Sequence, residues 1–243
     1  MPEQLWFTKV LNNLFGAMAT SLLRHLGIEP AHAAAPINNT VAMEVLVVLL
    51  LILFFLVVRS RLSVENPGRL QHVIEIAQDF IGEQAQGIIG PYYEPYMPYV
   101  MALGFFILLS NLIGVVPGFD SPTASPSVPL GCAIVTFIYY QFHGIRRHGW
   151  HYYKQFVGPV WALAWLMLPI EIISHLARVL SLTVRLYANM FAGDLVTWAF
   201  FSLVPVLIPV AFLGLHIFVA LVQTFIFVML TLAYLGMAVS EEH

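Results

Sequence analysis

The side chains that could do chemistry lie in two apolar stretches in the C-terminal third of the sequence. The first stretch carries Glu171, His175, Arg178, Arg185, Asn189 and Asp194. On a helix that turns 100° per residue, the first five of these fall within a stripe about 80° wide. Asp194 lies outside this stripe, so we expect a residue from another part of the chain to contact it.

The second stretch presents His216 and Gln223, which lie nearly on one face of a helix because they are seven residues apart. They could face Asn189 and Asp194 if the two stretches pack against each other. Carboxylate, imidazole and amide groups in lipid form a natural proton relay, because histidine titrates near neutral pH. The pattern therefore predicts a proton pathway.

Two structural interpretations of the same side chains stay open. The two arginines could pair with Glu171 and Asp194 to hold helices together, and His216 with Gln223 could be ordinary interhelical hydrogen-bond partners. A charge at mid-bilayer costs from about 2.5 to over 10 kcal/mol, whereas a whole domain is stable by roughly 5–15 kcal/mol. Under either interpretation, these residues need a partner or a cavity.

The composition places these stretches in a bilayer. Of 243 residues, 60% are hydrophobic and 9% charged, whereas soluble domains are about 45–50% apolar and 25% charged. The ten Lys and Arg nearly balance the thirteen Asp and Glu, so the chain has no excess of positive charge that would attract nucleic acid. A single cysteine, Cys132, excludes an intrachain disulfide.

The pattern of apolar runs predicts an all-α polytopic membrane protein with about five embedded helices. About 20 apolar residues suffice to cross the hydrocarbon core. The expected spans are 41–58, 97–116, 128–143, 160–203 and 208–239.

The fourth span is long enough for two crossings. Roughly 43 helical residues, from Pro159 to Leu203, make about 65 Å of helix, twice the hydrocarbon thickness. They form either two crossings or one steeply tilted helix that Pro169 can kink. We favour the second, with a turn marked by Pro205 and Pro209 and the last two helices as a long, strongly tilted hairpin.

Two further segments lie outside these spans. Residues 70–89 place apolar side chains on one face and polar ones mostly away from it, which predicts a surface amphipathic helix. Residues 1–40 are expected to form an N-terminal extracytoplasmic or interfacial segment, and 41–243 a single membrane domain. The apolar spacing in the N-terminal segment fits an interfacial or a solvated helix equally well. No signal peptide is expected, because Arg24 and His25 interrupt the apolar run that one needs.

The distribution of basic residues predicts the orientation of the chain. Basic residues follow the first and third spans, whereas the 117–129 loop and the 205–209 turn contain no Lys or Arg. These basic residues are Arg59, Arg61, Arg69, Arg146, Arg147 and Lys154. Because cytoplasmic loops carry an excess of Lys and Arg, the N-terminus is expected outside and the C-terminus in the cytoplasm.

Two other classes of protein share features with this sequence. His143, His148 and His151 resemble one histidine box of a membrane desaturase, but such enzymes need several, and no second His pair here has ligand spacing. A solvated basic loop explains this cluster better. A proton-coupled secondary transporter, the main alternative, predicts internal repeats, and the two halves show no convincing repeat.

Two strings of sequence carry a resemblance to a known family. The first, residues 180–194, contains Arg185 and Asn189, and the second begins at His216 and contains Gln223. Together they resemble the signature of subunit a, which belongs to the membrane (Fo) sector of F-type ATP synthases.

The resemblance covers roughly residue 41 to the end, with further support from 111–123 and 168–178. Two departures stand out. Ala188 occupies a position where the family usually has glycine, and Asp194 one where glutamate is common in some bacteria. A shorter acid at position 194 is expected to change the geometry of proton uptake.

The resemblance implies a mechanism. In this family a tilted hairpin of the last two helices lies against a rotating ring of c subunits, each with a lipid-exposed carboxylate. Two offset aqueous half-channels lead to the interface, and by resemblance Arg185 is the essential arginine between them. Residues assigned by resemblance to the outer half-channel are Asn189, Asp194, His216 and Gln223, and those that suit the inner side are Glu171 and His175.

The resemblance also implies partners and a location. The expected partners are the c ring, b-type peripheral stalk subunits and the rest of the ATP synthase, in a bacterial plasma (inner) membrane. Proton flow through this chain would drive ATP synthesis on other subunits, so no catalytic chemistry, metal or cofactor is expected here. The choice between proton and sodium rests mainly on the c subunit.

Overall fold

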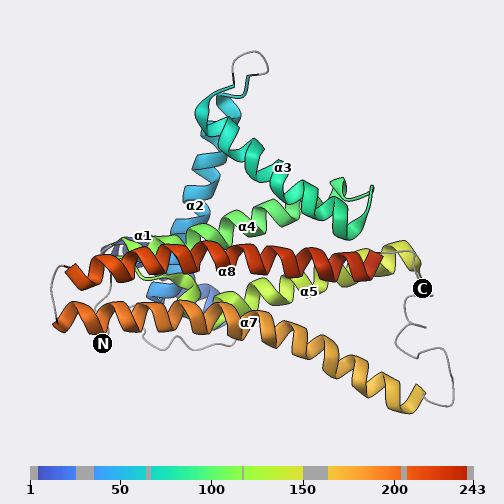
Figure 1. Ribbon diagram of the computed structural model, residues 1–243. Helices are drawn as coiled ribbons and strands as arrows, with labels where there is room; N and C mark the ends of the chain where they lie inside the picture. The colour runs from blue at the N-terminus through green and yellow to red at the C-terminus, as the bar shows by residue number, and fades with distance from the viewer. Residues whose placement is uncertain are drawn as a thin grey trace.

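The computed structural model describes residues 5–25, 36–63, 67–116, 118–149, 164–203 and 207–239 (Figure 1). Within these ranges the chain is helical apart from short connections, and no strand occurs. Five helices are long and apolar enough to cross a membrane. The prediction of an all-helical, multi-span fold is therefore confirmed.

Five described helices have the length of a membrane span. They are α2 (Asn39–Ser60), α4 (Met97–Leu112) with the 3₁₀ turns η1 (Glu94–Tyr96) and η2 (Ile113–Val115) at its ends, α5 (Ser127–His148), α7 (Ala164–Leu203) and α8 (Leu207–Val239). Two more helices, α1 (Trp6–His25) and α3 (Arg69–Ile89), are amphipathic. The amphipathic helix expected at 70–89 is thus present as α3, whose C-terminal part packs against α8.

α7 and α8 form the hairpin that holds most of the candidate site. α7 is one continuous α-helix of 40 residues with Pro169 inside it. The alternative of two crossings within 160–203 is therefore wrong. Figure 1 shows α7 and α8 side by side towards the end where α7 leads into α8, while the N-terminal part of α7 diverges from α8; α2 runs across their direction.

The expected boundaries differ from the observed ones at two places near the hairpin. Pro209 lies in the first turn of α8 and not in the connecting turn, because a proline at a helix start removes an N–H that has no intrahelical partner. Pro205 and residues 160–163 lie outside the described residues.

α5 is longer than the predicted third span. It continues to His148 and ends at Gly149, which adopts a φ of 57°. The segment from His143 to His148 was expected to be a loop and is helical instead, with His143 packed edge-on against Tyr96. His151 and Lys154 lie outside the described residues. In the described ranges no three His, Cys, Asp or Glu side chains group as metal ligands would.

The core lies where α4, α5, α7 and α8 meet. One buried cluster joins α4, α5 and α8 with the end of α3, and a second joins the middle of α4, α5 and α7 with α8. Glycines let these helices approach closely, as in many membrane bundles. A Cβ placed on Gly104 of α4, for example, would lie 3.1 Å from Val228 of α8.

Gly236→Ala is expected to lower the stability of the protein. The new Cβ would lie 2.9 Å from Ile88 Cγ2 and 3.0 Å from the Ile88 carbonyl oxygen. Because the second contact is with backbone, α3 must move away from α8, at a cost of about 1–3 kcal/mol. Thermal unfolding of the purified complex measures this. Gly87→Ala, whose Cβ meets nothing within 4 Å, is the control, and equal midpoints for both variants would contradict the close contact.

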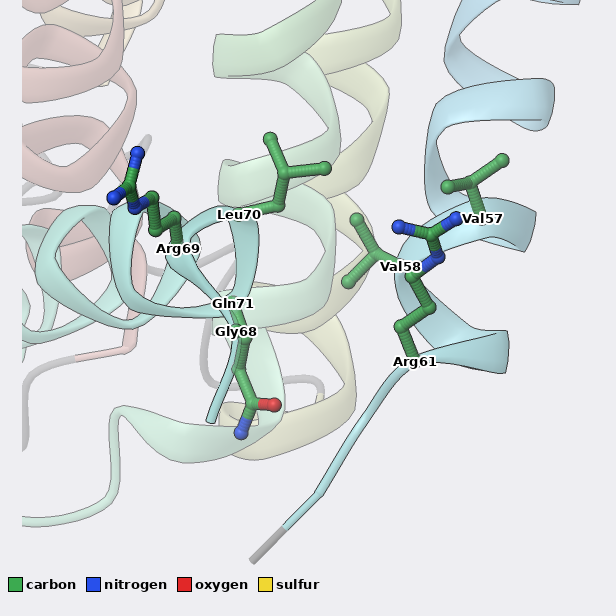
Figure 2. A pocket seen from close by; sticks show the side chains of 7 residues that line it. All are labelled: Val57, Val58, Arg61, Gly68, Arg69, Leu70 and Gln71. Carbon is green, nitrogen blue, oxygen red and sulfur yellow. The ribbon is translucent and has the colours of Figure 1, made fainter. Parts of the chain in front are cut away.

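A cavity of about 190 Å³ opens between the end of α2 and the start of α3. Figure 2 shows Arg61 and Arg69 on either side of it, with Leu70 between them. The Gln71 side chain of α3 holds the end of the α2 segment in place, since it donates to the Ser63 carbonyl and accepts from the Ser63 N–H, both at 3.1 Å. None of the residues that the sequence singles out for proton chemistry lines this cavity.

Candidate functional site

The polar residues of α7 follow the border between a packed and an open face. The packed face is formed by Leu182, Leu186 and Met190, which are buried. The open face is apolar and exposed, and it consists of Ile173, Leu176, Leu180, Val184, Phe191 and Leu195. Along the border His175 is buried, whereas Glu171, Arg178 and Asn189 are half-buried and Arg185 is exposed. The predicted stripe thus lies where core side chains give way to an unpacked apolar surface.

In the described part of the chain, the Arg185 side chain makes one hydrogen bond. Its Nη2 donates to Ser181 Oγ at 3.4 Å, one turn earlier on the same helix. No described carboxylate lies within ion-pair distance of its guanidinium. The alternative in which Arg185 pairs with a carboxylate of its own chain is therefore not found among the described residues.

Arg178 occupies a different environment two turns away. Its guanidinium carbon lies 5.4 Å from the centre of the Tyr234 ring of α8. Such cation–π contacts are worth about 0.5–2 kcal/mol. Arg178 therefore helps to hold α7 against α8, and it has no described carboxylate within ion-pair distance.

Asp194 and His216 meet across the hairpin, towards the end where α7 leads into α8. Asp194 Oδ1 lies 3.7 Å from His216 Nδ1, and His216 is only 5% exposed. The neighbour that Asp194 was expected to need is therefore supplied by α8. His216 Nε2 is buried and has no hydrogen-bond partner in the described ranges.

Gly193 makes the close approach of His216 possible. A Cβ at this position would lie 3.0 Å from His216 Nδ1. The imidazole thus fills the space beside the α7 backbone that any larger residue would take.

Gly193→Ala is expected to leave the fold intact and to slow proton uptake. The added methyl must push the His216 ring aside, and side-chain rotation allows this without moving either helix. Misplacing one group of a proton path is expected to reduce the rate of proton-driven ATP synthesis by about tenfold. Gly214→Ala in α8 is the matched control, because its Cβ meets nothing within 4 Å. Equal synthesis rates for the two variants would show that the position of His216 does not matter.

Glu171 and His175 form a second ionisable pair near the other end of α7. His175 Nε2 lies 3.4 Å from Glu171 Oε1, and the Tyr140 hydroxyl of α5 lies 3.1 Å from His175 Nδ1. Helical spacing placed Glu171 and His175 on one stripe of the helix, but their contact was not predicted from the sequence. The sequence did not single out Tyr140, because its contact depends on how α5 packs against α7.

Asn189 and Gln223 are half-buried, on α7 and α8 respectively. Neither amide makes a hydrogen bond to another residue in the described ranges. The structure thus places both on the facing helices of the hairpin but does not bond them to Asp194 or His216.

A buried network that the sequence did not reveal holds the connection between α4 and α5. Asn111 is fully buried, its Nδ2 lies 3.4 Å from the Ala220 carbonyl and from Thr224 Oγ1, and its Oδ1 accepts from Thr123 at 2.7 Å. Ser121 continues the network to Thr123 and to the backbone of α4. The connection, which includes the 3₁₀ turn η3 (Pro122–Ala124), is therefore fixed to α8 and packs on α7.

This connection also carries Asp120. The carboxyl keeps contact with solvent, but the protein around it partly desolvates it, which raises the pKa of Asp120 above its ordinary value. Asp120 lies close enough to Asp194 for the two carboxyl groups to interact electrostatically. The connection between α4 and α5 therefore adds a second carboxyl group near Asp194.

The fold and these side chains define a multi-pass helical membrane protein with ionisable pairs inside its longest hairpin. Residues 41–236 match the family described as ATP synthase A chain. The sequence is 53% identical to ATP synthase subunit a of Koribacter versatilis over the whole of both chains. It is 44% identical to that of Solibacter usitatus over 96% of this chain and 100% of the relative, and 36% identical to that of Geobacter sulfurreducens over 89% and 94%.

The chain belongs to the ATP synthase A chain family, whose members are subunit a of the Fo sector. The resemblance seen in the sequence is confirmed. A place in an ATP synthase complex follows from membership, as does a multi-pass position in the bacterial inner membrane. Because the chain belongs to this family, we favour it over the alternative of a proton-coupled secondary transporter.

Proposed function

We propose that this chain provides the stator proton channel of its ATP synthase, with Arg185 as the charge that couples proton flow to rotation of the c ring. The observation that carries the proposal is the environment of Arg185. Arg185 is an exposed cation beside the open apolar face of α7, and no described carboxylate lies within ion-pair distance of it. A charge at lipid depth persists only beside a partner or water, and a carboxylate on a neighbouring subunit meets that need.

Arg185 suits this task because a guanidinium stays protonated throughout. A rotor carboxylate that reaches it becomes ionised beside the positive charge and gives its proton to the exit path. The same cation repels protons that would otherwise pass directly between the two half-channels. Each proton that crosses 100 mV makes about 2.3 kcal/mol available for rotation.

The spacing along α7 supports two separate half-channels. At 1.5 Å per residue, Glu171 lies about 21 Å from Arg185 along the helix, and Asp194 lies about 14 Å from it on the other side. One ionisable pair therefore sits on each side of the arginine. In our proposal the Asp194–His216 pair takes protons in, and the Glu171–His175 pair releases them to the cytoplasm.

The environment of His216 supports an aqueous outer path. A buried polar atom without a partner costs about 1–3 kcal/mol, which favours a water molecule beside Nε2. Asn189 and Gln223, whose amides have no described hydrogen-bond partner, would line the same path. Water-connected groups of this kind can pass protons from the outside to the rotor.

The remaining parts of the proposal concern orientation and partners. The basic residues after α2 and within α5 favour a cytoplasmic location for those ends, with the N-terminus outside and the C-terminus inside. The open faces of α2 and α7 are apolar and suit helices of the b-type stalk and the c ring. We propose no catalytic chemistry, metal or cofactor for this chain, since other subunits make ATP.

Co-purification and proton pumping test the assignment together. The chain, extracted in mild detergent, should carry the c ring and the b-type subunits with it, and inverted vesicles that contain the complex should acidify when ATP is added. Absence of the c ring from an otherwise intact, monodisperse preparation would contradict the proposal.

A further inference from the structure

Tyr140 of α5 makes a buried contact that the proposed path does not yet use. Its side chain is 2% exposed, and its hydroxyl oxygen lies 3.1 Å from His175 Nδ1. The other ring nitrogen, Nε2, lies 3.4 Å from Glu171 Oε1. The imidazole of His175 is therefore held between a buried hydroxyl and a carboxylate whose side chain is 37% exposed.

Neutral histidine carries one ring proton, and the partner of each nitrogen decides which nitrogen holds it. If a carboxylate beside Nε2 were the only partner of the ring, the ring proton would stay on Nε2. A hydroxyl oxygen that accepts from Nδ1–H favours the other tautomer and leaves Nε2 free to gain and lose a proton. The Tyr140 oxygen is in position to accept that bond.

Among the described residues, the other charged and titratable groups around His175 leave this arrangement intact. On its own helix, Glu171 faces Nε2, and Arg178 lies one turn further on. The guanidinium of Arg178 is held over the Tyr234 ring of α8, and the Tyr234 ring itself packs against Tyr140 at 5.9 Å. α5 contributes the tyrosine hydroxyl, so the groups that α5 and α8 bring to this place are aromatic and uncharged.

We propose that Tyr140 is a positioning residue of the inner half-channel, which holds His175 as the Nδ1–H tautomer so that Nε2 alone exchanges protons with Glu171. The step is balanced. The imidazolium gives its Nε2 proton to the Glu171 carboxylate, an N–H bond breaks and an O–H bond forms, and the resulting carboxyl releases the proton to cytoplasmic water. Neutral His175 then accepts the next proton at Nε2. This inference rests on the proposed function, because it assigns a role within the inner path.

Tyr140→Phe tests the proposal in the assembled complex. This substitution removes the hydroxyl and keeps the ring that packs against Phe137 and Tyr234. In vesicles with a fixed outer pH, we expect proton-driven ATP synthesis to fall roughly tenfold, as is typical when a group that orients a reactive side chain is lost. We also expect its dependence on inner pH to change while its dependence on outer pH stays as in the wild type.

Tyr99→Phe is the matched control. Tyr99 also makes a hydroxyl contact within the bundle, part-buried and at 2.9 Å to Thr136 of α5, but no described contact joins it to His175 or Glu171. The Tyr99→Phe complex is therefore expected to keep the inner-pH profile of the wild type. Combining Tyr140→Phe with His175→Gln should cause no further loss beyond that of His175→Gln, because both changes remove one function.

Three outcomes would overturn the proposal. They are an unchanged inner-pH profile in Tyr140→Phe, a fully additive loss in the double variant, and failure of Tyr140→Phe to assemble where Tyr99→Phe assembles. The last would assign the hydroxyl to folding. The proposed function is judged separately, on loss of coupling in Arg185→Ala with Tyr140 intact, so the two can fail independently.

Discussion

Arg185→Ala is expected to abolish proton-driven ATP synthesis while the complex still assembles. An opposite charge within about 4–6 Å lowers the pKa of a carboxyl by about 1–3 units, so its loss makes ionisation of the rotor acid about 10- to 1,000-fold less favourable. The rotor carboxylate would then keep its proton as it passes α7. ATP synthesis by energised vesicles, and ATP-driven acidification of inverted ones, measure the effect.

The exposed position of Arg185 explains why assembly should survive. Its one described contact is a 3.4 Å hydrogen bond to Ser181, so its removal leaves no buried partner unpaired. Loss of the cation should also open a passive proton leak, because nothing then repels protons that move between the half-channels. The leak is measured as decay of an imposed pH difference without ATP.

Two variants serve as controls for this result. Arg185→Lys keeps a positive charge on a compact ammonium that can deprotonate, so it should retain little coupling. Arg178→Ala removes the same type of charge from the same helix, but from a cation that lies over the Tyr234 ring. It should keep most of its ATP synthesis. Equal loss in Arg178→Ala and Arg185→Ala would show that any intramembrane arginine of α7 is needed, and full coupling in Arg185→Ala would remove the central assignment.

Asp194→Asn is expected to slow proton uptake by about 10² while assembly stays intact, a loss typical of one missing proton-transfer group. The amide has the shape of the carboxyl but cannot carry a proton. His216 would lose the charged group that lies 3.7 Å from its Nδ1. The effect should depend on outer pH and be weakest where a high outer proton concentration compensates for slow uptake.

Asp194→Glu is the conservative control, because glutamate differs from aspartate by one methylene group. It should keep most of the activity, since the carboxyl is retained. Asp194→Asn combined with His216→Gln should be no worse than the more severe single variant, because both residues act in one path. Failure of Asp194→Asn to assemble would instead support a structural role for the pair.

Much of this architecture could be predicted from the sequence because membranes leave few alternatives. Apolar runs of about 20 residues must be helical, since lipid offers the backbone no hydrogen bonds. The sequence also predicted one long helix over most of 160–203, and α7 is continuous over 40 residues. Helical spacing also showed that Asp194 would need a neighbour from elsewhere, and His216 fills that role.

The missed features depend on tertiary packing. The Tyr140–His175 contact depends on the rotation of α5 against α7, which helical periodicity within one segment cannot specify. The Asn111 network joins residues more than 100 positions apart, at 3.4 Å from Asn111 to Ala220 and Thr224. The extension of α5 to His148 was missed because its last turns are polar, although they remain helical beyond the apolar run.

Disulfide cross-linking along α7 tests most directly whether Arg185 faces the rotor. With Cys132 replaced by alanine, a cysteine at Val184, which is 57% exposed beside Arg185, is paired with one next to the carboxylate of the c subunit. The matched control is Thr183→Cys, on a side chain that is 7% exposed and packed within the bundle. We predict rapid cross-linking of Val184→Cys to the ring and none from Thr183→Cys. Cross-linking from Thr183→Cys alone, or from neither position in a complex that retains its ring, would contradict a rotor-facing arginine.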